Sequence, residues 1–153
     1  MRDWGEEIKE VGHNDIPDLV GHEYVACQIA EMGAMGYHGG VFLVRSDGEM
    51  FFTTRSEKPD DLHSKLTWDE LVRVFPPLKE FKPGMFGTLQ VNIPQGFSYE
   101  YLGMGNHLLV KEELFGRFKK IAEIIRARDG GNKIMYNLWL EAILALVRDE
   151  EVK

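Results

Sequence analysis

The most unusual hydrophobic pattern lies near the C-terminus, where residues 134–147 read IMYNLWLEAILALV and only Asn137 and Glu141 are strongly polar. A surface helix normally has an apolar stripe and a polar face, whereas this segment is apolar nearly all round. At 1.5 Å per residue it spans roughly 21 Å, which is too short to cross a bilayer comfortably. The pattern therefore predicts a helix that is covered either by the rest of the chain or by a second molecule.

A second copy of the chain is the simplest external cover for this helix. Asn137 and Glu141 are four residues apart and share a helix face, so an exposed face would be theirs. A monomer rarely leaves a large contiguous apolar patch in water, and twofold dimers are the commonest soluble oligomers. The candidate dimer interface comprises the apolar residues around that face: Ile134, Leu138, Trp139, Leu140 and Leu144.

Three further helices are expected from periodicity and end signals. Segment 111–128 carries an apolar stripe, with acids at its start and bases at its end, as the helix dipole favours. Segment 67–75 opens with the capping-box spacing of Thr67 and Glu70 and stops before two prolines. Segment 18–33 is predicted to be a helix because several of its apolar residues fall near one helical face.

Strand signals fill most of the remaining chain. Residues 41–54 form two apolar runs around Asp47-Gly48, a pair favoured in hairpin turns. Residues 86–94 alternate between apolar and polar side chains, which is typical of a half-buried antiparallel strand. A strand at 97–103 is expected to follow, and residues 106–110 either extend it or form the next strand.

These elements predict an α+β fold. Short turns between strands favour a mostly antiparallel sheet of about 4–5 strands, with helices packed on one face and the two C-terminal helices forming a hairpin. The length of 153 residues fits one domain. We expect an acidic N-terminal arm over 1–18 and a single domain over 19–153.

Composition narrows the possible partners and the compartment. The net charge of −7 argues against a broad nucleic-acid footprint, which needs clustered Lys and Arg. Cys27 is the only cysteine, so no intramolecular disulfide can form and a reducing cytoplasm is expected. The N-terminus does not resemble a secretion signal, and no apolar run is long enough to span a membrane.

No motif for a cofactor or a metal stands out. The glycine-rich segment 33–40 follows a predicted helix and precedes a strand, which is the wrong order for a phosphate-binding loop. Cys27 and His38 could pair as thiol and imidazole, but a cysteine on an apolar face is more often a core residue. A metal site would have to combine distant residues such as His38, Glu100 and His107. We therefore predict neither cofactor nor metal.

The segment FSYEYLGMGNH, residues 97–107, is the most suggestive place for a ligand. Tyr99 and Tyr101 share one side of the predicted strand and Glu100 lies on the other. Aromatic side chains and a carboxylate can line a pocket for a small apolar or cationic ligand, although they can equally form an aromatic core. The candidate ligand-binding residues are His38, Tyr99, Glu100, Tyr101 and His107.

Two functional hypotheses remain open from the sequence. The first is a non-enzymatic cytoplasmic protein that acts by association, as a homodimer that binds a protein partner or a small molecule. The second is a small enzyme with a cleft between loop 33–40 and strand 97–107. No catalytic residue can be assigned for the second hypothesis.

Overall fold

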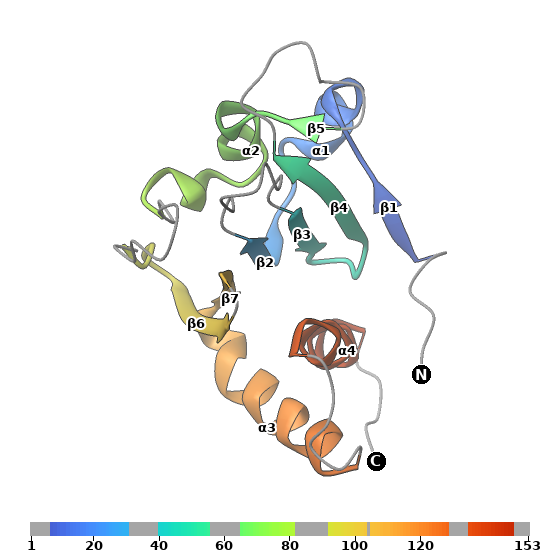
Figure 1. Ribbon diagram of the computed structural model, residues 1–153, viewed down its shortest axis with the longest axis vertical. Coiled ribbons are helices and arrows are strands. Elements are labelled where there is room, and N and C mark those ends of the chain that lie inside the picture. The colour runs from blue at the N-terminus through green and yellow to red at the C-terminus, as the bar shows by residue number, and fades with distance from the viewer. Residues whose placement is uncertain are drawn as a thin grey trace.

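The computed structural model describes residues 7–30, 40–55, 65–81, 92–103, 105–128 and 135–148, which form one mostly antiparallel seven-stranded sheet and four α-helices (Figure 1). The sheet order is β1-β4-β3-β2-β7-β6. β5 also pairs with β4, along the end of β4 that follows the residues paired with β1. β1 and β5 run parallel to β4, and every other pair is antiparallel. The strands are β1 (Ile8–Glu10), β2 (Tyr24–Ala30), β3 (Gly40–Arg45), β4 (Met50–Arg55), β5 (Lys65–Leu66), β6 (Phe97–Gly103) and β7 (Asn106–Lys111).

The helices cover both faces of this sheet. In Figure 1, α1 (Ile16–Leu19) and α2 (Trp68–Val74) lie on one side, and α3 (Glu112–Arg128) and α4 (Met135–Val147) lie on the other. Two separate hydrophobic cores result, one on each face. The central strands β2, β3 and β7 contribute buried side chains to both cores, so they are apolar on both faces.

The predicted α+β class, the mostly antiparallel sheet and the packing of the two C-terminal helices on each other are confirmed. Two details differ from the expectation. The sheet has seven strands rather than four or five, and the short helices α1 and α2 occupy the face that was expected to lack helices. Very short strands such as β1 and β5 leave too little periodic pattern to be recognised in a sequence.

The predicted helix over 18–33 is wrong, because Tyr24–Ala30 forms β2 in the middle of the sheet. Cys27 and Ile29 enter one core, and Val25 and Ala26 enter the other. A strand buried on both faces lacks alternation, and a short apolar run of this kind cannot be distinguished from a helix by periodicity alone.

The segment predicted as an N-terminal arm contributes to the fold from residue 7 onward. β1 pairs with the first half of β4, and Val11 and Ile16 are buried in the core beside α1 and α2. Residues 1–6 lie outside the described part of the chain. Pairing with a sheet edge fixes this segment although its composition is polar.

The remaining predictions of local structure are mostly confirmed. β3 and β4 form the hairpin around Asp47-Gly48, where Gly48 has a φ of 90°. The Thr67 hydroxyl accepts from the Glu70 amide at 3.2 Å, and the Glu70 carboxylate accepts from the Thr67 amide at 3.0 Å, so the capping box of α2 is formed. In the predicted strand 86–94, residues 86–91 lie outside the described chain, and 92–94 are not in a strand.

The apolar C-terminal helix is covered by the chain itself. Seven of its side chains between Leu138 and Leu146 are at most 4% exposed, and Leu146 is 7% exposed. They pack between the sheet and α3, and full burial of each large aliphatic side chain stabilises the fold by roughly 1.5–3 kcal/mol. Among the described residues, no helix combines the length and the apolar character that crossing a membrane requires.

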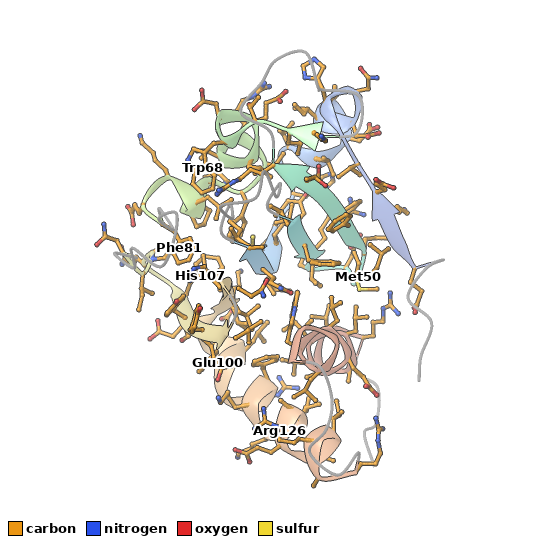
Figure 2. All side chains as sticks on the ribbon, viewed as in Figure 1. Met50, Trp68, Phe81, Glu100, His107 and Arg126 are labelled. Carbon is orange, nitrogen blue, oxygen red and sulfur yellow. The ribbon has the colours of Figure 1, made fainter. Side chains whose placement is uncertain are left out.

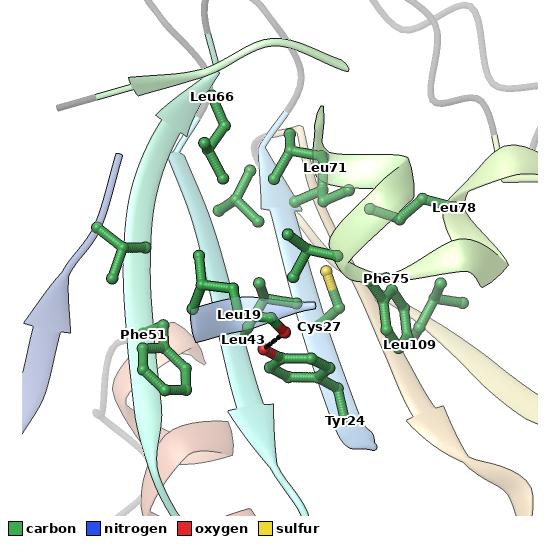
Figure 3. Packing of buried hydrophobic residues seen from close by; sticks show 14 of the residues in the cluster. Leu19, Tyr24, Cys27, Leu43, Phe51, Leu66, Leu71, Phe75, Leu78 and Leu109 are labelled. Carbon is green, nitrogen blue, oxygen red and sulfur yellow. Dashed lines mark hydrogen bonds between the residues drawn. The ribbon is translucent and has the colours of Figure 1, made fainter. Parts of the chain in front are cut away.

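A first prediction concerns Tyr24, whose hydroxyl donates to the Leu19 carbonyl at 2.6 Å inside the core on the α1 and α2 side of the sheet (Figure 3). Burial raises the pKa of Tyr24 to about 12. Tyr24→Phe leaves a buried carbonyl without its donor and should lower the free energy of unfolding by about 1 to 2 kcal/mol, measured by urea denaturation. The control Tyr101→Phe removes a hydroxyl that accepts from the Gly105 amide at a solvent-exposed site, on a tyrosine 45% exposed, where water can replace the lost bond. It should change the free energy of unfolding by less than about 0.5 kcal/mol. Equal losses in both variants would contradict this account.

A second prediction concerns Glu70, which closes the capping box and also accepts from Nδ1 of His13 at 2.5 Å. Burial raises the pKa of Glu70, but the Thr67 and His13 hydrogen bonds together outweigh it, so the net pKa is below its ordinary value of 4.5. The ionised carboxylate therefore contributes stability above pH 4.5, and this contribution is lost as the pH falls through the folded-state pKa. Denaturation midpoints of the wild type should fall more steeply below pH 4.5 than those of Glu70→Gln. Parallel pH curves for the two proteins would show that Glu70 makes no such contribution.

Candidate ligand-binding cleft

Successive side chains of β6 point to opposite faces of the sheet, and this alternation separates the residues of segment 97–107. Phe97 and Tyr99 pack against the core beneath α2, whereas Leu102 packs against the core of α3 and α4. Glu100 shares the α3 side, where its carboxylate binds Lys119. The predicted ligand-binding residues therefore belong to two different sites.

The first site is a packed aromatic cluster around His107. The imidazole is 1% exposed, and its Nδ1 forms a 2.7 Å hydrogen bond with the Tyr99 hydroxyl. Its ring lies 5.8 Å from the Phe81 ring and 5.3 Å from the Tyr101 ring, measured between centroids, and Figure 2 shows Phe81 beside His107. These contacts satisfy and enclose the imidazole, which is the arrangement of a core histidine.

The second site is a cleft on the other face, where β6, α3 and the first half of α4 meet. Its volume is about 110 Å³. The lining consists of an apolar floor and a charged rim, with Glu100 and Arg126 of the rim labelled in Figure 2. The lining residues are Glu100, Leu102, Phe118, Lys119, Ala122, Glu123, Arg126, Leu138 and Trp139.

The floor of the cleft is held in place by a buried polar chain that reaches into the sheet. The Trp139 indole N–H donates to the Gln28 side-chain oxygen on β2, and the Gln28 amide donates to the Asn106 side-chain oxygen on β7 at 3.0 Å. Gln28 is 4% exposed and Trp139 is 1% exposed. Because buried polar groups are costly unless they are bonded, this chain fixes the orientation of the indole that walls the cleft.

The rim consists mainly of side chains from successive turns of α3. Lys119, Glu123 and Arg126 lie four and three residues apart, so they line one edge of the helix. Lys119 binds Glu100 across the gap between α3 and β6, with the two side chains 43% and 27% exposed. The rim thus places two acids and two bases above an apolar floor.

The structure brings Tyr99, Tyr101 and His107 together but separates them from Glu100, which is the one described residue of the predicted ligand-binding set that lines the cleft. His38 lies in 31–39, outside the described residues. Glu100 and His107 lie on opposite faces of the sheet, so they cannot share a metal ion. Across the described ranges, no group of three or more His, Cys, Asp or Glu side chains could hold a metal.

The residues predicted as a dimer interface are buried within a single chain. Leu138, Trp139, Leu140 and Leu144 are between 0 and 4% exposed, and Ile134 lies outside the described residues. Leu138 and Trp139 instead form part of the cleft floor. In this fold the four described side chains are not on a free surface.

Sequence reasoning missed the rim residues of α3 and the role of Gln28. Lys119, Glu123 and Arg126 look like the ordinary solvated face of an amphipathic helix, because nothing in the chain indicates that β6 lies opposite them. Gln28 was placed in a predicted helix, where its partners could not be inferred. Only the polar side chain within an apolar run gave a signal that it makes a specific buried contact.

A third prediction tests whether Cys27 could act as a nucleophile. Cys27 is 1% exposed in the core on the α1 and α2 side of the sheet, and burial raises the pKa of its thiol (Figure 3). The native protein should therefore react with a thiol reagent such as DTNB at least about a hundredfold more slowly than the protein in denaturant, because reaction requires local opening. Rapid stoichiometric labelling of the native protein would contradict this burial.

Three comparisons with known proteins add no assignment: no protein-family model, no curated protein and no solved structure matches this chain.

Proposed function

We propose that this protein acts by non-catalytic binding of a small organic molecule in the cleft between β6, α3 and α4. The observation that carries the proposal is the combination of an apolar floor with a charged rim in one concave site. Small-molecule sites commonly combine these two features, because apolar walls supply affinity and a few polar groups fix orientation.

The chemistry of the lining favours binding over catalysis. Among the described residues that line the cleft there is no hydroxyl, thiol or imidazole group. The carboxylate of Glu100 is engaged by Lys119. The alternative is an enzyme with a cleft between loop 33–40 and strand 97–107, and residues 33–39 of that loop lie outside the described chain. On the strand side, the Tyr99 and His107 side chains are packed against each other and against Phe81.

Self-association and a cytoplasmic location stay predictions beside this proposal. A homodimer would have to use a surface other than the buried residues of α4, and light scattering at high micromolar concentration is the direct measurement. The single, buried Cys27 fits a reducing compartment.

A fourth prediction tests the cleft with a substitution that fills it. Ala122 lines the cleft and is only partly exposed, whereas Ala127 on the same helix is exposed and lies outside the lining. In a fragment screen followed by ¹H–¹⁵N NMR, fragments that shift the Trp139 indole resonance should bind Ala122→Leu at least about tenfold more weakly than wild type. The same fragments should bind Ala127→Leu with unchanged affinity.

Two results would reject the proposed function. One is a fragment library of several hundred compounds from which none shifts the Trp139 indole resonance. The other is binding that Ala122→Leu leaves unchanged. Circular dichroism melting of both alanine variants shows that any lost binding reflects a filled cleft and not an unfolded chain.

A further inference from the structure

Resting on the proposed function, we propose that the ligand of this cleft is a small zwitterion with an apolar body, of the chemical class of an aliphatic α-amino acid. The proposal follows from the juxtaposition of Glu123 and Arg126 on the α3 rim, directly above the apolar floor. The apolar floor corresponds to the apolar body of such a molecule, and the two rim charges correspond to its ammonium and carboxylate.

The floor sets the size and polarity of the ligand body. Leu102, Phe118, Leu138 and Trp139 contribute apolar surface around a volume of about 110 Å³. For comparison, an apolar protein cavity of about 150 Å³ accommodates benzene. The cleft therefore suits a side chain of about four to six carbon atoms and excludes a nucleotide or an extended lipid.

The α3 rim supplies two neighbouring opposite charges, one for each charged group of a zwitterion. Glu123 and Arg126 are three residues apart on one helix, so their Cβ atoms are about 5–6 Å apart. A carboxylate is an acceptor-only group that suits an ammonium, and a planar guanidinium binds a carboxylate through two parallel hydrogen bonds. Both side chains are exposed, and a ligand carboxylate would replace the interaction that Arg126 already makes.

The other two rim charges leave no net preference for a simple ion. Lys119 and Glu100 bind each other across the gap, and they close one side of the cleft. With two acids and two bases in the lining, a ligand with a single charge gains attraction from one group and repulsion from another. A ligand that places its ammonium at Glu123 and its carboxylate at Arg126 avoids that repulsion.

The test uses L-leucine and three analogues that each lack part of its charge, titrated into the full chain and followed by NMR shifts of the cleft residues. 3-Methylbutylamine lacks the carboxylate, 4-methylpentanoate lacks the ammonium, and 4-methylpentanamide carries no charge. We expect L-leucine to bind at least about tenfold more tightly than each analogue, because each lost charged hydrogen bond costs roughly that factor.

Two substitutions assign the charges. Glu123→Gln should weaken binding of L-leucine and of the amine about tenfold and leave the acid unchanged. Arg126→Gln should weaken binding of L-leucine and of the acid by a similar factor and leave the amine unchanged. Glu113→Gln and Arg117→Gln, at exposed positions of α3 outside the cleft lining, are the matched controls and should leave all four affinities unchanged.

The outcomes separate the ligand class from the cleft itself. An analogue that binds as tightly as L-leucine in the cleft, with binding abolished by Ala122→Leu, overturns the zwitterion proposal and leaves the proposed function standing. Equal effects of the two charge variants on all probes also overturn it. Absence of any shift with all four probes at 50 mM, together with an empty fragment screen, overturns both proposals.

Discussion

The packing of α4 against the sheet is the constraint on which the rest of the structure depends. This helix is apolar nearly all round, so most of its surface must be covered by other parts of the fold. The sheet covers one side and α3 covers another, and the buried Trp139–Gln28–Asn106 chain fixes the helix in one orientation. At its far end, Arg148 donates to Glu7 and to the Gly48 carbonyl, which ties α4 to the N-terminal segment and to the β3–β4 turn.

This constraint explains why the central strands carry apolar side chains on both faces. β2 must contribute to the core of α4 and also to the core of α1 and α2, so polar residues are almost excluded from it. The exception is Gln28, whose oxygen accepts from the buried Trp139 indole and whose amide donates to the partly buried Asn106. A sheet covered on both faces leaves space for a cleft at its edge, where a helix and an edge strand diverge.

β6 is an edge strand of the sheet, and its two faces have different surroundings. On the α2 side, Tyr99 and Tyr101 surround the buried His107 and leave a packed cluster. On the α3 side, Glu100 and Leu102 border a space that α3 and α4 do not fill. One strand thus separates a structural aromatic cluster from a cleft, so Glu100 lies apart from Tyr99, Tyr101 and His107.

Local sequence was sufficient for elements whose pattern is set by one face or by one end. The stripe of α3, the capping box of Thr67 and Glu70, and the Asp47-Gly48 turn each follow from interactions within a few residues of each other. The sequence likewise determined that the last helix must be covered, because its own composition makes exposure costly.

Tertiary structure decided what covers that helix, whether residues 24–30 form a strand or a helix, and where the cleft lies. A run that is apolar on both faces fits a buried strand and a buried helix equally well. Only the pairing with β3 and β7 makes residues 24–30 a strand. The cleft joins residues 100–102, 118–126 and 138–139, and no local pattern links segments that far apart. Charges on α3 become a rim only because β6 lies opposite them, and that proximity exists only in the folded chain.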